Sequence, residues 1–276
     1  MMCRLFGMLS VKPCNVSKYL INDPCSLLAQ SNADPKRPQR DGWGIGYYSD
    51  GAPVVIRSSR PVYEEPERFS SVVRSASSRI IVAHIRRASN PRGLPRDRII
   101  SAENSQPFNY KEYLFAHNGV INIPDEVAER LGGWRRKLRS LNDSEVYFWY
   151  IIKEITNGAT LRNALKVFEG TLSDLWHENR GKYSDKERPY VGLNIILSDG
   201  KRLYVYCKYQ KEDESEYSLC FREQPVFQLS YLSSPTRLIV ASEKTNKEDD
   251  WQTLKSGQLI TASILGGKVK LQICEV

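Results

Sequence analysis

Cys3 is the residue of this chain whose type and position best suit covalent catalysis. An N-terminal cysteine carries a thiol nucleophile and an α-amino group, whose ordinary pKa of about 7.7–8.0 suits it to accept the thiol proton. Such a nucleophile needs no separate histidine. Because most cysteines near a chain start are structural or incidental, position alone is a weak signal. The hypothesis is that Cys3 attacks a substrate carbonyl.

The histidines offer an alternative base. The chain has only His84, His117 and His177. His84 and His117 fall inside or at the end of apolar stretches that read as strands, where a buried, hydrogen-bonded imidazole is the commoner role. A Cys/His dyad therefore stays open as an alternative to a self-sufficient N-terminal cysteine.

Asn118 and Gly119 follow His117 at the end of the apolar stretch 113–116. Asn-Gly after a strand is normally a turn. The catalytic alternative is an oxyanion hole, in which the Asn118 side-chain amide and the Gly119 backbone N–H point at one developing oxyanion. Loss of one such donor typically lowers the rate by about 10²–10³.

Two charged residues suit a substrate that is itself charged. Arg86 follows the β-branched stretch 79–85. An arginine there is usually solvated, but at a site it would hold a carboxylate in a bidentate pair. Asp143 opens a predicted helix, where capping is the commoner role. As a site residue it would hold an ammonium group.

The elements that must position these residues are predicted in successive blocks of one type along the chain. Asp50-Gly51 is a hairpin signal, Ser140 to Asp143 has the spacing of a capping box, and Asn157-Gly158 is a stop signal. Thr160 opens a second helix, whose apolar stripe at 161, 165, 168, 172 and 175 is expected to be core. Strands are predicted at 3–9, 43–48, 53–57, 79–85, 113–117, 191–197, 202–206, 238–241, 258–264 and 268–273. Strands, then helices, then hairpins indicate an α+β protein with antiparallel sheets.

Taken together, six segments resemble a known family in their order. They are Met-Cys-Arg-Leu-Phe-Gly at 2–7, Asp-Gly-Trp-Gly-Ile-Gly-Tyr at 41–47, Ala-His-Ile-Arg-Arg-Ala-Ser at 83–89, Glu-Asn-Ser-Gln-Pro-Phe at 103–108, His-Asn-Gly at 117–119 and Asp-Ser-Glu at 143–145. The ordered set resembles the class II glutamine amidotransferase domain. Within it, the chain is most similar to the stand-alone branch that resembles the amidohydrolases of ergothioneine synthesis and glutathione breakdown.

The resemblance implies an N-terminal-nucleophile hydrolase fold, a four-layer αββα sandwich of two antiparallel sheets, with residues 3–276 as a single domain. It implies that the Cys3 thiol is the nucleophile and its α-amino group the base, and that Asn118 and Gly119 form the oxyanion hole. Arg86 would bind the substrate α-carboxylate and Asp143 its α-ammonium group. Ser89 stands where the family usually has a threonine lining the glutamine pocket.

The implied reaction is hydrolysis of the γ-amide of glutamine or of a γ-glutamyl compound. Cys3 would form a γ-glutamyl thioester, ammonia or an amine would leave, and water would release glutamate. No metal or organic cofactor is implied. Two alternatives stay open: a glutaminase subunit that passes ammonia to a partner protein, and a catalytically silent binding or regulatory module.

The two methionines before Cys3 depart from the family pattern, which needs cysteine as the first residue after methionine removal. If the natural start is Met2, the departure disappears. If both methionines persist, Cys3 has an amide nitrogen in place of an amine, and the base is lost.

Composition sets the broader expectations. The net charge is +8, but the basic residues are scattered, so nucleic acid is not expected as a partner. No apolar stretch approaches the length of a membrane span, and the start of the chain leads into only a short apolar run with no cleavage-site pattern, so a cytoplasmic location is expected. Six cysteines show no CxxC pair or zinc-ligand spacing, and all except Cys3 are expected to be small apolar residues in a reducing compartment.

Overall fold

Two antiparallel sheets pack face to face in the computed structural model, which describes residues 3–210 and 216–276. The first sheet has the strand order β11 (Gln252–Thr253), β9 (Ser230–Ser234), β10 (Arg237–Ala241), β1 (Arg4–Cys14), β4 (Ser78–Ile85), β2 (Trp43–Ser49) and β3 (Ala52–Ser58). The second has the order β13 (Lys268–Glu275), β12 (Gln258–Leu265), β8 (Leu203–Tyr206), β7 (Tyr190–Ser198), β6 (Tyr113–Ile121) and β5 (Phe108–Tyr110).

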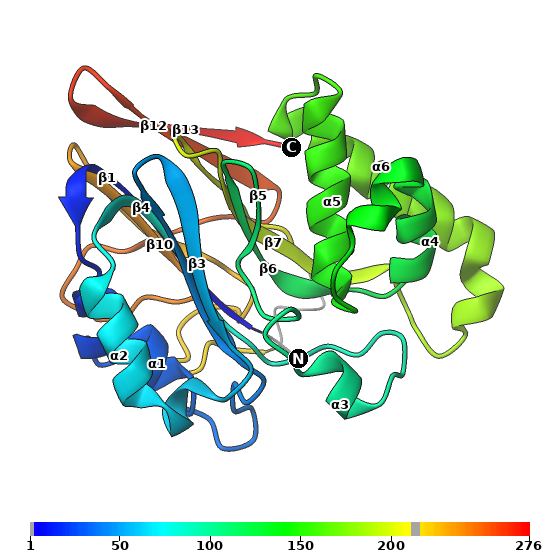
Figure 1. Cartoon of the computed structure of the whole chain (residues 1–276), viewed down its shortest axis with the longest axis horizontal. Coiled ribbons are helices and arrows are strands. Elements are labelled where there is room, and N and C mark those ends of the chain that lie inside the picture. Colours follow the sequence, from blue (N-terminus) through cyan, green and yellow to red (C-terminus); the bar gives the residue numbers. More distant parts are fainter. Residues whose placement is uncertain (1–2, 211–215) are drawn as a thin grey trace.

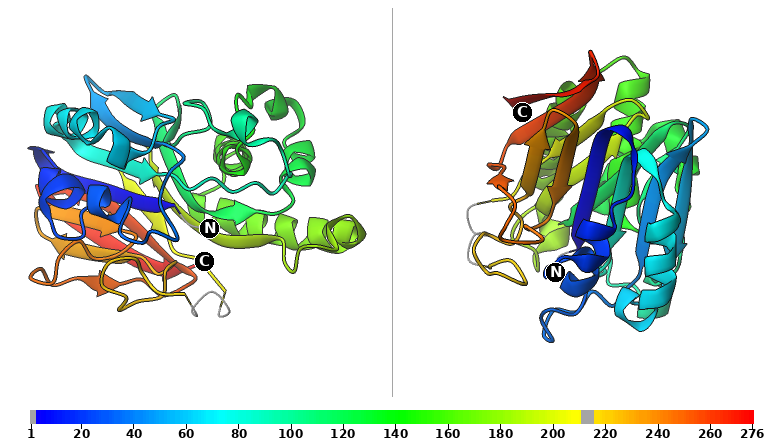
Figure 2. Two further views of the ribbon diagram at one scale, coloured as in Figure 1. Left: turned by 90° about the horizontal axis from the view of Figure 1, so that it is seen from below. Right: turned by 90° about the vertical axis from the view of Figure 1, so that its left-hand side faces the viewer.

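Helices cover the outer faces of both sheets (Figures 1 and 2). The first sheet is covered by α1 (Leu27–Gln30) and α2 (Pro66–Ser75), with the short turns η1 (Lys18–Asn22) and η2 (Val62–Glu64) beside them. The second is covered by α4 (Pro124–Arg130), α5 (Asp143–Thr156) and α6 (Leu161–Asn179), with η3 (Gly132–Lys137) and η4 (Arg180–Tyr183). The short α3 (Arg96–Ile99) lies in the connection from β4 to β5. These layers are the predicted αββα sandwich.

Three apolar clusters hold the layers together, as alternating strand residues require. The cluster between the sheets includes Leu5, Val82, Ala116, Ile196 and Ile260 from both inner faces. A second cluster lies between α5, α6 and their sheet, and a third beneath α1 and α2. The predicted helical stripe of α6 is core, because its residues at 161, 165, 168, 172 and 175 are all buried.

Local signals mark several element boundaries correctly. Asp50 and Gly51 join β2 to β3 with positive φ values of 50° and 80°, as the predicted hairpin turn needs. Thr160 caps α6 by accepting the Asn163 N–H. The predicted capping box at Ser140 is wrong, because Asn142 is the cap and its side chain accepts the Ser144 N–H.

Asn118 and Gly119 do not form the turn that an Asn-Gly pair usually makes. Strand β6 continues through both residues to Ile121 and pairs with β7 along its length, with a bulge between Gly119 and Val120. A side chain at Gly119 is excluded, because a Cβ there would lie 2.0 Å from the Gly192 carbonyl oxygen. Glycine therefore serves close strand packing at this position.

The expectation of unpaired structural cysteines fails at one pair. Cys25 and Cys220 form a disulfide across 195 residues of sequence, whereas Cys3, Cys14, Cys207 and Cys274 are free. Within the described ranges, no helix combines the length and apolar character needed to cross a bilayer.

Candidate active site

Cys3 lies directly before β1, the strand that runs between β10 and β4. Because β1 and β4 are antiparallel, with Arg4 opposite Ile85, the start of β1 meets the end of β4. The Cys3 Sγ atom therefore reaches the segment that follows β4, and it lies 3.5 Å from both the backbone nitrogen and the carbonyl oxygen of Arg87. The sheet register thus places the thiol beside residues 86–89.

The Cys3 thiol is almost enclosed, with 8% of the residue exposed. Burial raises the pKa of the Cys3 thiol to about 11, although the Arg87 N–H and the positive charge of Arg86 act in the opposite direction. The carboxylates of Asp143 and Asp41 raise it further. The thiol is therefore protonated at neutral pH, and any attack requires a base to remove its proton.

Arg86 is buried and held in place by the chain around it. Its Nη1 atom donates to the Ile99 carbonyl oxygen at 2.8 Å, and its backbone N–H donates to the Gly42 carbonyl oxygen at 2.8 Å. In the described parts of the chain, no carboxylate is within ion-pair distance of this guanidinium. Burial lowers the pKa of Arg86, and the neighbouring Cys3, Asp41 and Asp143 oppose that effect. A buried guanidinium without a carboxylate partner suits an anionic ligand.

Asp143 begins α5, but its carboxylate does not cap the helix. Its Oδ1 atom accepts the Ser89 hydroxyl at 2.8 Å, and its Oδ2 atom accepts the Ile121 N–H at 2.8 Å. Ser89 belongs to the same segment that contacts the Cys3 thiol. The structure thus brings Cys3, Arg86, Ser89 and Asp143 into one electrostatic neighbourhood, in which the charges of Arg86 and Asp143 both affect the Cys3 pKa.

Asn118 has an exposed fraction of 0%, yet neither atom of its side-chain amide has a hydrogen-bond partner among the described residues. Buried amides are nearly always paired, so this one needs an explanation. Its partner across the β6–β7 ladder, Asn194, is satisfied: Asn194 donates to the Phe227 carbonyl oxygen and accepts the Lys208 N–H at 2.7 Å. The unpaired donor of Asn118 is what an oxyanion-binding amide would present.

Both strand histidines are buried, as predicted, but the expected hydrogen bonds are found only for His117: neither ring nitrogen of His84 has a partner among the described residues. Burial lowers the pKa of His84 to about 3 and that of His117 to about 4. The His117 ring nitrogens lie 2.9 Å from the Ser144 hydroxyl and 3.3 Å from the Gly192 carbonyl oxygen. These properties favour neutral, structural imidazoles over a Cys/His dyad.

Asp41 is a site neighbour that the sequence reasoning did not single out. Its Oδ2 atom accepts the Ala88 N–H at 2.7 Å, and its Oδ1 atom pairs with Arg96. Asp41 thereby ties the segment after β4 to α3. The signal in the sequence that could have identified Asp41 is its position as the first residue of the 41–47 segment. The glycines of that segment pack closely against other backbone: a Cβ at Gly44 would lie 2.2 Å from the Gln106 carbonyl oxygen.

A second polar cluster forms around Arg4, the first residue of β1. Arg4 is fully buried, and its Nη1 atom is 4.0 Å from a carboxylate oxygen of Glu243. Glu243 also accepts the backbone N–H groups of Leu219 and Cys220. The atoms of Cys25, Cys220 and Glu243 lie within 4.8 Å of one another. Since the sulfurs are joined and the carboxylate already accepts two hydrogen bonds, this cluster is structural.

Comparison with known proteins gives one family for almost the whole chain. Residues 2–275 match the family model of the class II glutamine amidotransferases. The chain is also 33% identical, over 126 residues, to a gamma-glutamyl-hercynylcysteine sulfoxide hydrolase of Mycobacterium tuberculosis. That match covers 44% of this chain and 50% of the relative, so the chain spans about half the length of that curated protein.

Solved structures support the same architecture. A class II glutamine aminotransferase domain protein from Silicibacter pomeroyi superposes with a TM-score of 0.62 at 18% identity, covering 98% of each chain. The glutamine phosphoribosylpyrophosphate amidotransferase of Bacillus subtilis superposes with a TM-score of 0.58 at 14% identity, covering 98% of this chain and 49% of the other. At these identities the likeness concerns the fold.

Proposed function

The chain belongs to the class II glutamine amidotransferases, and from that premise we propose that it is a cysteine-dependent amidohydrolase acting on the γ-amide of glutamine or of a γ-glutamyl compound. One observation carries the proposal. The Cys3 thiol contacts the segment that contains Arg86 and Ser89, and Ser89 is hydrogen-bonded to Asp143. A nucleophile, a buried cation and a buried anion therefore face one small region, as an amino acid substrate requires.

The charged pair sets the orientation of the substrate. The Arg86 guanidinium binds the α-carboxylate of the substrate. The Asp143 carboxylate accepts hydrogen bonds from the substrate's α-ammonium group, and the Ser89 hydroxyl holds the Asp143 side chain in position. When the carboxylate and the ammonium group on the substrate's α-carbon are both held, the substrate side chain extends toward Cys3. This supports a γ-glutamyl group as the common part of the substrates.

The reaction begins with proton removal from the buried Cys3 thiol. The α-amino group that a processed Cys3 carries takes this proton, and the sulfur forms a bond to the γ-carbonyl carbon. The Asn118 amide and the Gly119 N–H stabilise the oxyanion. The C–N bond then breaks, and ammonia or an amine leaves with the proton. Water hydrolyses the thioester, which releases glutamate and regenerates the thiol.

Residues 3–276 act as a single domain, without a resident metal or organic cofactor, in the cytoplasm. The similarity to a gamma-glutamyl-hercynylcysteine sulfoxide hydrolase supports a γ-glutamyl compound as the substrate. A separate ammonia-accepting partner protein is the alternative use of the same site; nucleic acid and membrane are not expected partners.

A substrate panel tests the proposal. The native-start protein is incubated with glutamine, γ-glutamyl amides and γ-glutamyl peptides, and released glutamate is measured. Cys3→Ala is the control. We expect turnover of at least one substrate that the variant lacks. Absence of glutamate release from every substrate, with and without candidate partner proteins, would favour a silent binding module.

A further inference from the structure

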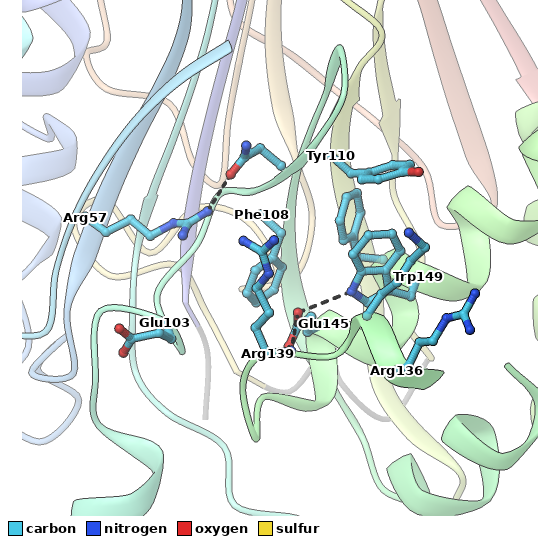
Figure 3. A pocket seen from close by; sticks show the side chains of 11 residues that line it. Arg57, Glu103, Phe108, Tyr110, Arg136, Arg139, Glu145 and Trp149 are labelled. Carbon is cyan, nitrogen blue, oxygen red and sulfur yellow. Dashed lines mark hydrogen bonds between the residues drawn. The ribbon is translucent and has the colours of Figure 1, made fainter. Parts of the chain in front are cut away.

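A cavity of about 430 Å³ lies beside the first turns of α5, on the side that carries Glu145 (Figure 3). Asp143 and Glu145 stand two residues apart, so their side chains leave the helix at about 200° from each other. Asp143 faces Ile121 of β6, whereas Glu145 faces the cavity. The cavity is therefore separate from the Cys3 site. Its volume is in the range of small-molecule sites, about 300–1,000 Å³.

One side of the cavity is cationic. The Arg57 side chain is fixed by its Nε and Nη2 atoms, which donate to the Pro107 carbonyl oxygen at 2.9 and 2.6 Å. Arg136 and Arg139 are exposed, and within the described ranges neither guanidinium has a hydrogen-bond or ion-pair partner. Figure 3 shows the Arg139 side chain extending between Arg57 and the aromatic side chains. Two guanidinium groups are thus free to bind an anion.

The acidic residues do not neutralise these arginines. The Glu145 carboxylate already accepts the backbone N–H groups of Arg139 and Ser140, the Ser140 hydroxyl and the Trp149 indole N–H at 3.2 Å. Glu103, the other acidic residue of the lining, is exposed. Since four lining residues are basic and two are acidic, the cavity has a net charge of +2. Its electrostatics favour an anionic ligand.

The opposite side is aromatic. Tyr110 and Trp149 meet edge to face with ring centroids 4.9 Å apart, and Phe108 also lines the cavity. The Lys137 ammonium is 4.8 Å from the Tyr110 ring centroid and 5.6 Å from that of Trp149. Large rigid rings beside free guanidinium groups provide both ring contacts and anion contacts within one small volume.

We propose that this cavity is a second ligand site, which binds a small anion carrying an aromatic ring, of the class of a nucleoside monophosphate. Arg136 and Arg139 bind the phosphate, because a guanidinium fits phosphate oxygens in a bidentate pair. The ring lies against Tyr110 and Trp149. The site would give this glutaminase-type chain a ligand unrelated to the γ-glutamyl group.

Calorimetric titration of the full chain with AMP, adenosine and inorganic phosphate tests the proposal. We expect one AMP per chain with a Kd below about 1 mM, and at least tenfold weaker binding of adenosine and of phosphate, since each lacks half of the contacts. Binding to Cys3→Ala should be unchanged, which separates this outcome from any failure of the catalytic proposal.

Two double variants localise the binding. Arg136→Ala with Arg139→Ala should weaken AMP binding by about tenfold or more, as loss of charge-assisted hydrogen bonds does. Arg74→Ala with Arg79→Ala removes two other exposed arginines and should leave AMP binding unchanged. The proposal is overturned if AMP does not bind, if phosphate alone binds as tightly, if the two double variants behave alike, or if a glutamine analogue displaces AMP.

Discussion

The Ser89 hydroxyl donates a 2.8 Å hydrogen bond to the Oδ1 atom of Asp143, which joins the segment after β4 to the first turn of α5. The two residues are 54 positions apart and belong to different layers of the sandwich. Since the Ile121 N–H occupies the other carboxylate oxygen at 2.8 Å, the Asp143 side chain is fixed by both the segment after β4 and strand β6. The carboxylate is therefore preorganised for a cation before any substrate arrives.

This bond gives the first prediction. Ser89→Ala should raise the KM for a γ-glutamyl substrate by about tenfold, the effect of one hydrogen bond to a charged group, with a smaller change in kcat. Ser89→Thr keeps the hydroxyl and should stay within about threefold of the parent KM. Steady-state glutamate release measures both. Equal effects of alanine and threonine would mean that the hydroxyl does not position Asp143.

Asn118 gives a prediction in which activity and stability change in opposite directions. Asn118→Leu should lower kcat by about 10²–10³, because one oxyanion donor is lost. The melting temperature should stay the same or rise, because a buried amide without partners is replaced by an apolar side chain of similar size.

The matched control is Asn194→Leu, on the neighbouring strand. Asn194 is also buried, but both of its amide atoms are hydrogen-bonded. The variant leaves the Lys208 N–H unpaired and leaves the Phe227 carbonyl with only the 3.9 Å contact from the Cys207 Sγ atom. Thermal unfolding should show a loss of about 1–3 kcal/mol per group left unpaired. A comparable loss in Asn118→Leu would show that the Asn118 amide is structural.

The buried histidines predict the direction of acid destabilisation. The pKa of His84 is about 3 in the folded state, against an ordinary value of 6.5. As the pH falls below 6.5, the unfolded chain binds this proton first, so stability decreases toward acid pH and is unaffected above that value. His84→Asn should therefore reduce the slope of unfolding free energy against pH by about 1.4 kcal/mol per pH unit near pH 5.

Denaturant unfolding between pH 7 and pH 4 measures this slope. His177→Asn, which replaces an exposed histidine, is the matched control. An unaltered slope in His84→Asn would mean that this imidazole is charged in the folded protein.

The Cys25–Cys220 disulfide predicts a redox-dependent stability. Cys220→Ser should lower the unfolding free energy by about 2–5 kcal/mol, because the bond closes a very long loop in the unfolded chain. Dithiothreitol should lower the melting temperature of the parent and leave that of the variant unchanged. Cys14→Ser, which alters a half-buried free thiol, is the control. A parent protein indifferent to reductant would contradict the expectation.

Local patterns were sufficient for much of the fold. The Asp50-Gly51 turn, the Thr160 cap and the apolar stripe of α6 each depend on residues close together in the sequence, so their structures follow from turn and helix geometry. The family was also recognisable, because the six segments retain their residue types in the family's order.

Apart from the helix cap, which is Asn142 and not Ser140, local patterns missed contacts between distant segments. Asn118-Gly119 has the composition of a turn, but the Gly192 carbonyl makes glycine necessary within a continuous strand. The pairing of Cys25 with Cys220 spans 195 residues, and no spacing rule encodes it. The link of Asp41 to Ala88 and Arg96 likewise depends on how β4 and α3 lie in space.

The central claim is that Cys3, freed of the methionines before it, is the nucleophile. Met1 and Met2 lie outside the described residues, so their removal remains a prediction. The intact mass of the native-start protein, before and after treatment with the glutamine-analogue electrophile diazo-oxo-norleucine, tests it most directly. We predict loss of both methionines and one stoichiometric adduct on Cys3, absent from Cys3→Ala. Retention of both methionines with an unlabelled Cys3, under conditions that label a known amidotransferase, would contradict it.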